Sequence, residues 1–300
     1  MGDATVKKTA FRLPGEALII AAGIFWGSMG IFVRRLTELG CSSSQTVCLR
    51  LVGTALIFLL ALLLFSPGSL KVKGRDLPFF ALMGLGSIVF FTVCYFSAIN
   101  MMSMAAAAIL LYTSPVWVML MALIFFREKM TGKKLLAMLL AFSGCALISG
   151  LGGGITLPGL LVGLGAGIGY ALCSILGTVA LKKYEPLTVT AWTFIFAAAG
   201  SLFICKPLEL IEAVASAPRP GGLLLFCLAM SLVTAVIPFS AYTLGLKSTP
   251  AGKAAVLATV EPLAAALIGL AVFKERLGLG AVAGIVLILA AIILLSAKNK

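Results

Sequence analysis

Long apolar runs, separated by short polar segments, follow one another along the whole chain. The runs are continuous rather than alternating, and each has about the 20 residues that a helix needs to cross the apolar part of a bilayer. Backbone groups in lipid must be hydrogen-bonded within the protein, so such runs predict helices and not the alternating strands of a barrel. We therefore predict an all-α polytopic membrane protein with ten transmembrane helices. Their expected ranges are 16–36, 44–65, 77–99, 103–126, 133–149, 158–180, 187–204, 222–246, 251–273 and 278–297.

The sequence is also repeated. Residues 95–129 align without a gap on residues 242–276 at a constant offset of 147, and the front parts of the two copies align at an offset of 144. Each copy holds five predicted spans, and an odd number places the second copy upside down relative to the first. Inverted repeats of this kind are typical of alternating-access transporters, with the substrate site between the halves. Equivalent positions include Pro115 and Pro262, Glu128 and Glu275, and Trp26 and Tyr170.

This repetition divides the chain into five parts. We expect a cytoplasmic N-terminus at 1–15, a first five-helix repeat at 16–149, a linker at 150–157, a second five-helix repeat at 158–297 and a cytoplasmic C-terminus at 298–300.

Composition excludes an ordinary soluble domain, and the charge distribution indicates the topology. Hydrophobic residues make up 61% of the chain and charged residues 11%, whereas soluble domains carry about a quarter charged residues. Of the 23 Lys and Arg residues, sixteen fall on the side of the predicted membrane that holds both termini and six on the other. Because positive residues favour the cytoplasm, both termini are expected there, in the inner membrane of a bacterial-type cell. The net charge of +13 is thus a topology signal, and no nucleic-acid partner is expected.

The chain lacks the residues that metal and enzyme sites need. It has no histidine, and no pair of its seven scattered cysteines has metal-ligand spacing, so we expect no metal and no cofactor. An intramembrane enzyme would need a nucleophile with a base, paired carboxylates or a metal. A single carboxylate, Glu261, lies deep in a predicted span, and an enzyme is therefore not expected.

Glu261, Lys253 and Arg50 lie within predicted spans and are candidates for coupling or charge pairing. A carboxyl group in lipid favours its neutral form unless a cation is near, so Glu261 fits either a proton-coupling group or a structural carboxylate bonded to backbone amides or an arginine. Lys253 either extends to the cytoplasmic surface or meets an anionic group at the mouth of a cavity. Arg50 either pairs with a carboxylate or helix-end carbonyls, or binds an anionic group of a substrate.

Two prolines stand within spans at equivalent positions of the repeats. Pro115 and Pro262 each remove a backbone hydrogen bond and can kink a helix. Neighbouring groups satisfy freed carbonyls in many membrane helices, but the matched placement favours a hinge role in opening and closing a central cavity.

Aromatic and small polar side chains within the spans form the candidate substrate-binding set. Trp26, Tyr95, Tyr170 and Tyr242 lie near mid-span, where an interfacial aromatic belt does not predict them. A cavity lined by such rings suits aromatic, amphipathic or cationic solutes. The full set is Trp26, Tyr95, Asn100, Tyr112, Ser114, Trp117, Tyr170, Ser174 and Tyr242.

Several of these residues lie in longer motifs. The motifs are Gly23-Ile24-Phe25-Trp26-Gly27, Arg50, Ser114-Pro115 followed by Phe126-Arg127-Glu128-Lys129, and Glu261-Pro262 followed by Phe273-Lys274-Glu275-Arg276-Leu277. On these residues the chain resembles the drug/metabolite transporter superfamily, in its EamA-type group with two five-helix repeats, over nearly its whole length. The resemblance implies cytoplasmic termini and a central cavity built mainly by the first, third, fourth, sixth, eighth and ninth helices. It also implies export, or sometimes uptake, of amino acids and other small metabolites.

We therefore expect an exporter of amino acids or similar small organic metabolites that works by alternating access. A sugar-phosphate or nucleotide-sugar exchanger is an alternative, but it needs cations to hold phosphate, and Arg50 and Lys253 are the candidates. A non-transporting membrane receptor is a further alternative, although the soluble signalling region expected of one is missing. The expected partners are a small-molecule substrate and the lipid bilayer. Proton coupling and the oligomeric state are left open, and a monomer suffices for this architecture.

Overall fold

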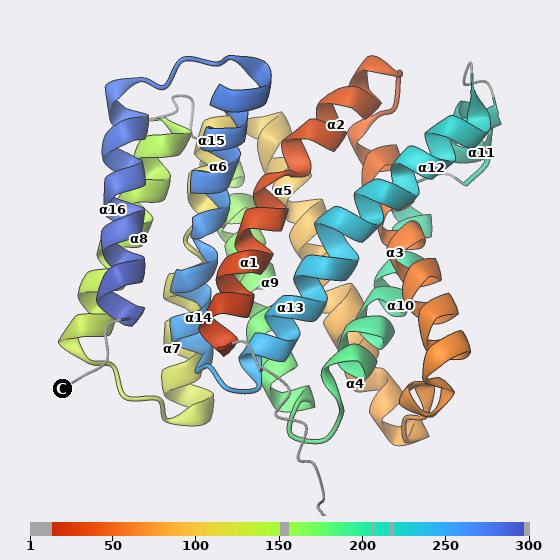
Figure 1. Cartoon of the computed structure of the whole chain (residues 1–300), viewed down its shortest axis with the longest axis horizontal. Coiled ribbons are helices and arrows are strands. Elements are labelled where there is room, and N and C mark those ends of the chain that lie inside the picture. The colour runs from red at the N-terminus through yellow and green to blue at the C-terminus, as the bar shows by residue number, and fades with distance from the viewer. Residues whose placement is uncertain (1–13, 151–155, 206, 216–218, 297–300) are drawn as a thin grey trace, which may run out of the picture.

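The computed structural model describes residues 14–150, 156–205, 207–215 and 219–296. These residues form helices and no strand, and ten helical segments among them are long and apolar enough to cross a membrane (Figure 1). The spans are Gly15–Glu38, Ser43–Phe65, Gly74–Met101, Ala106–Phe126, Gly132–Ser149, Leu157–Ala180, Pro186–Ile204, Pro220–Leu246, Ala251–Phe273 and Leu279–Ser296. The predicted fold class is confirmed, and each predicted range agrees to within three residues at either end. The predictions for 1–13, 151–155 and 298–300 lie outside the described residues.

Several spans consist of more than one helical element. The first repeat contains α1 (Gly15–Gly27), α2 (Met29–Glu38), α3 (Ser43–Phe65), the 3-10 helices η1 (Pro67–Leu70) and η2 (Gly74–Asp76), α4 (Leu77–Ala81), the π-helix η3 (Leu82–Val89), α5 (Phe90–Met101), α6 (Met104–Leu111), α7 (Ser114–Phe126) and α8 (Gly132–Ser149). The second contains α9 (Leu157–Ala180), α10 (Pro186–Ile204), α11 (Pro207–Ala215), α12 (Pro220–Ser231), the π-helix η4 (Leu232–Val236), α13 (Ile237–Leu246), α14 (Ala251–Ala258), α15 (Val260–Phe273) and α16 (Leu279–Ser296).

Short polar side chains mark where some of these helices begin. The hydroxyl of Ser42 accepts a hydrogen bond from the backbone N–H of Gln45 at the start of α3, and Thr131 and Thr156 cap α8 and α9 in the same way. The first turn of a helix has N–H groups with no partner inside the helix, and these hydroxyls satisfy one of them.

The two repeats are interleaved rather than placed side by side. The most extensive helix contacts cross between them and are matched by pseudo-two-fold symmetry: α8 packs on α16, α3 on α10, and the pair α1–α13 has its counterpart in α9–α5. Self-complementary contacts of this kind are the signature of a two-fold relation. With five spans in each copy, they confirm the inverted repeat. The start of α1 and the end of α16 lie at one face of the bundle, here called the terminal face, and α2 and α11 lie at the opposite face (Figure 1).

The fourth span of each repeat is broken at the same position. Helix α6 ends at Leu111 and α7 begins at Ser114, while α14 ends at Ala258 and α15 begins at Val260. Pro115 and Pro262 occupy the first turn of the second half-helix in each span, where a missing N–H costs no hydrogen bond. The predicted kinks therefore lie at short breaks between two half-helices.

Both broken spans also end alike. Arg127 and Lys274, which are repeat equivalents, adopt left-handed conformations with φ of 53° and 54°. The N–H of the next residue, Glu128 or Glu275, bonds to a carbonyl six residues earlier, and a residue with positive φ is a common end to a helix.

Glycines allow the first helix of each repeat to approach the broken span of the other. A Cβ on Gly27 of α1 would lie 2.8 Å from the carbonyl oxygen of Glu261, and a Cβ on Gly167 of α9 would lie 2.9 Å from that of Leu110. Small residues at such crossings permit direct backbone contact in lipid. The breaks in the fourth spans are therefore held between the repeats.

The crossing of α8 and α16 leads to a stability prediction. A Cβ at Gly144 would lie 2.7 Å from both the carbonyl oxygen of Gly284 and the side chain of Ile288, whereas one at Gly132 of the same helix would meet nothing within 4 Å. We expect Gly144→Ala to lower the free energy of unfolding by about 1–3 kcal/mol, the usual cost of overpacking. Gly132→Ala should have no effect or slightly raise it, since alanine favours helix. Thermal unfolding in detergent measures both, and equal midpoints would contradict the close crossing.

Candidate functional site

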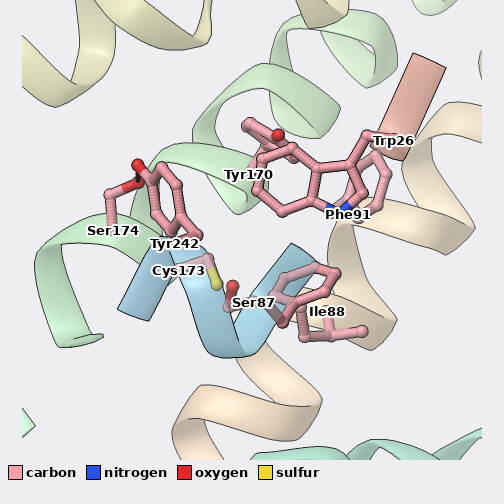
Figure 2. A pocket seen from close by; sticks show the side chains of 9 residues that line it. Trp26, Ser87, Ile88, Phe91, Tyr170, Cys173, Ser174 and Tyr242 are labelled. Atoms are coloured by element: carbon pink, nitrogen blue, oxygen red, sulfur yellow. Dashed lines mark hydrogen bonds between the residues drawn. The ribbon is translucent and has the colours of Figure 1, made fainter. Parts of the chain in front are cut away.

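The first of two adjoining pockets, which we call the aromatic pocket, lies between the repeats. Its cavity volume in this structure is about 20 Å³, which is room for about one water molecule. Helices α1 and α5 and the π-helix η3 supply one part of the wall, and α9 and α13 of the second repeat supply the other. The lining residues are Trp26, Ser87, Ile88, Phe91, Tyr170, Cys173, Ser174, Phe239 and Tyr242 (Figure 2).

The rings of the aromatic pocket pack against one another. The ring centroid of Trp26 lies 5.0 Å from that of Phe239, 5.4 Å from Tyr242 and 6.4 Å from Tyr170, and Phe91 meets Tyr170 edge-on at 5.5 Å. These separations are in the range for favourable aromatic pairs. The result is a wall of flat apolar surface from both repeats.

The second pocket, which we call the carboxylate pocket, shares Tyr170 with the first and has a cavity volume of about 20 Å³. It lies at the two helix breaks. Leu111, Tyr112, Ser114 and Pro115 come from the fourth span, and Ala255, Ala258, Thr259 and Glu261 come from the ninth.

Glu261 is the ionisable acid of the carboxylate pocket. It stands in the first turn of α15, directly after the break. Its carboxylate is within hydrogen-bonding reach of the Tyr170 hydroxyl and within the electrostatic field of Arg50. An acidic residue at this depth is a functional candidate by default. Its contact with Tyr170 links the two pockets.

Arg50 contacts a distorted helix instead of lining a pocket. Its Nε donates to the hydroxyl of Thr234 at 3.1 Å, and its Nη2 donates to the Thr234 carbonyl at 2.7 Å. Thr234 belongs to η4, where the π-helical spacing disturbs the normal hydrogen-bond pattern. Arg50 therefore joins the second span to the eighth.

Polar contacts join the repeats at the terminal face. The carboxylate of Glu128 accepts a hydrogen bond at 3.1 Å from the N–H of Ala251, the first residue of α14. It also forms an ion pair with Lys134 at 3.1 Å. The ammonium group of Lys253 pairs with Glu16 at 2.5 Å. Lys253 is therefore held in an ion pair that joins the two repeats, and it lines neither pocket.

A third connection at this face involves Asp76 of the first repeat. Its carboxylate forms an ion pair with Lys183 and accepts a hydrogen bond from the hydroxyl of Tyr184, both in the segment after α9. The same hydroxyl accepts a hydrogen bond from the N–H of Lys73 at 3.1 Å.

At the opposite face, the repeats are joined differently. Arg34 of α2 pairs with Glu275 and lies 4.0 Å from the ring centroid of Phe273. Both charged side chains are about half exposed, and exposed pairs contribute little to stability. Glu275 is the repeat equivalent of Glu128, but it pairs with Arg34 and does not cap a helix. The start of α6, which is the counterpart of α14, is capped by the hydroxyl of Ser103 instead. The two faces are therefore held unequally.

The nine predicted substrate-binding residues divide into three groups. Trp26, Tyr170, Ser174 and Tyr242 line the aromatic pocket, and Tyr112 and Ser114 join Tyr170 in the carboxylate pocket. Tyr95, Asn100 and Trp117 line neither pocket.

Each residue of the third group has another environment. The ring of Tyr95 stacks on that of Phe91, with centroids 6.2 Å apart. Trp117 donates its Nε1 to the hydroxyl of Thr113 at 3.1 Å, beside the helix break, and Asn100 is exposed on α5.

Sequence reasoning missed several lining residues, among them Phe91, Phe239, Ser87, Cys173 and Thr259. A signal for the two phenylalanines was present. Phe91 lies four residues before Tyr95, and Phe239 three before Tyr242, spacings that place side chains on one helix face.

Two inverted five-helix halves with a shared site at their seam have the architecture of a secondary transporter of the membrane. The chain belongs to the EamA-like transporter family, whose model matches it twice, at residues 13–150 and 157–297. The protein is thus a multi-pass membrane transporter, and the resemblance seen in its motifs is confirmed.

Known proteins similar to this chain add no substrate. An uncharacterized transporter of Archaeoglobus fulgidus is 30% identical over 281 residues, covering 93% of this chain and 95% of that protein. The uncharacterized transporter YyaM of Bacillus subtilis is 25% identical over 231 residues, covering 73% and 74%. A solved crystal structure has the same fold, with a TM-score of 0.78 and 17% identity over 94% of this chain and 96% of the other.

Proposed function

We propose that the protein exports amino acids or similar small organic metabolites across a bacterial-type inner membrane by alternating access. The observation that carries this proposal is the placement of both pockets at the seam, with walls supplied by both repeats. A movement of one repeat against the other would open the site to one face and close it to the other.

The unequal contacts at the two faces suggest how this movement is controlled. The basic excess on the side of the termini supports a cytoplasmic location of the terminal face. There, the cap of Glu128 on α14 and the pair of Lys253 with Glu16 close the path across the repeats. We assign this arrangement to a state closed toward the cytoplasm, and we assign the hinges to the breaks beside Pro115 and Pro262.

The chemistry of the pockets favours a substrate with an apolar body and an amine. Among the described residues that line them, Glu261 is the charged one, and none is lysine or arginine. A sugar phosphate would need cations, and both candidates, Arg50 and Lys253, are engaged elsewhere. We also assign proton coupling to Glu261, because its carboxylate lies at the meeting point of the pockets.

Flux through liposomes that contain the purified full chain tests the proposal. The liposomes are loaded with radiolabelled amino acids or related amines, and flux is measured with and without a pH gradient across the bilayer. We expect protein-dependent movement of at least one of these solutes. The movement should be faster when the pH gradient drives protons in the direction opposite to the substrate. If no solute moves under any gradient, the proposed function is wrong.

A further inference from the structure

The indole nitrogen of Trp26 is a buried hydrogen-bond donor without a partner. Trp26 is 7% exposed, and among the described residues its Nε1 and the hydroxyl of Thr46 are the two buried side-chain polar atoms that make no hydrogen bond. The ring of Trp26 lines the aromatic pocket (Figure 2). A buried polar group left without a partner is costly, so this donor needs an explanation.

Neighbouring polar groups of the pocket are already engaged. The hydroxyl of Ser87 donates to the carbonyl of Gly169 at 3.0 Å, and the hydroxyls of Ser174 and Tyr242 bond each other at 2.7 Å. These bonds tie helices together, and they leave the Trp26 N–H as the donor that a bound molecule can use.

The two pockets together define what such a molecule looks like. Rings of both repeats line the aromatic pocket, and the flat apolar body of a substrate would pack against them once the repeats have moved apart. Tyr170 leads from there to the carboxylate of Glu261 in the carboxylate pocket. A site with few polar groups selects ligands that supply a hydrogen-bond partner for each of those groups.

We propose that Trp26 is a specificity-determining residue, which donates its indole N–H to a hydrogen-bond acceptor on the aromatic body of an organic amine whose ammonium group faces Glu261. The inference rests on the proposed function and names the substrate class of that site. Amines of the same shape that lack the acceptor leave the indole N–H unpaired and therefore bind less tightly.

A matched pair of ligands tests this directly. The probes are 2-(4-acetylphenyl)ethylamine and 2-(4-isopropenylphenyl)ethylamine, which have nearly the same shape and charge but differ in one carbonyl oxygen. Calorimetric titration of the full chain in detergent gives both affinities. We expect the acetyl compound to bind about tenfold more tightly, as for one buried hydrogen bond.

Two variants separate hydrogen bonding from packing. In Trp26→Phe the two affinities should agree to within about twofold, since the donor is gone. In Phe91→Leu both affinities should fall together and the tenfold ratio should remain, because this change removes ring contact only. A merely structural role of Trp26 would lower both affinities equally and preserve the ratio.

Equal binding of the two probes by the unaltered protein, a ratio that survives in Trp26→Phe, or no binding of either probe would each overturn the inference. The flux assay distinguishes these results from failure of the proposed function. If the protein transports other solutes, the proposed function is supported even though the role assigned to Trp26 is wrong.

Discussion

Replacing Glu261 by glutamine lowers the transport rate in liposomes at least about 30-fold, the effect of losing about 2 kcal/mol from one partner of a buried charge interaction. The carboxylate lies in the carboxylate pocket, within reach of Tyr170 and in the field of Arg50. Glutamine keeps the shape but can neither carry charge nor release a proton. The residual transport of Glu261→Gln should also be insensitive to the pH gradient.

The control for this variant is Glu185→Gln, the same substitution in an exposed ion pair with Lys247 at the terminal face. Such pairs are worth at most about 1 kcal/mol, so transport should stay near the unaltered rate. Gradient-sensitive transport by Glu261→Gln at the unaltered rate would contradict the role assigned to Glu261.

The second large effect is expected from the repeat equivalents Glu128 and Glu275. Glu128→Ala removes the cap on Ala251 and leaves Lys134 without this ion-pair partner. Loss of a helix cap costs up to about 2 kcal/mol, equivalent to a population shift of about 30-fold toward the state open at the terminal face. Glu275→Ala removes the pair with Arg34 at the opposite face and should produce a smaller shift in the other direction.

Cys173 reports these shifts, because it lines the aromatic pocket. With the other six cysteines replaced by serine, an impermeant thiol reagent is added from one side of oriented vesicles. Glu128→Ala should speed labelling of Cys173 from the terminal face, and Glu275→Ala should speed it from the opposite face. Acceleration from the same side by both variants would show that the two glutamates do not hold opposite faces.

The sequence predicted the spans and their inversion well because both depend on features that are linear along the chain. Apolar length fixes a span, and the alignment at offset 147 fixes the equivalence of Pro115 and Pro262. The deep carboxylate at Glu261 was visible for the same reason, since one charge in an apolar run needs no structural context to be recognised.

The orientation of side chains around each helix was harder to predict. A helix in lipid is apolar on all sides, so polarity does not tell which face meets the protein. Tyr95 therefore looked equivalent to Tyr242, although Tyr242 lines the aromatic pocket and Tyr95 does not.

Long-range partners were hidden for a different reason. The pair of Lys253 with Glu16 joins residues 237 positions apart, and the bond of Arg50 to Thr234 depends on a π-helical turn that no local pattern marked.

The central claim, that the repeats move against each other around a site at their seam, is tested most directly by fixing each face in turn. Cysteines replace Glu16 and Lys253 at the terminal face, or Arg34 and Glu275 at the opposite face, in a chain free of its native cysteines. A short reducible thiol crosslinker then bridges each pair, and flux is measured before and after reduction. We predict that either bridge stops transport and that reduction restores it, whereas unchanged flux through a fully bridged protein would contradict the account.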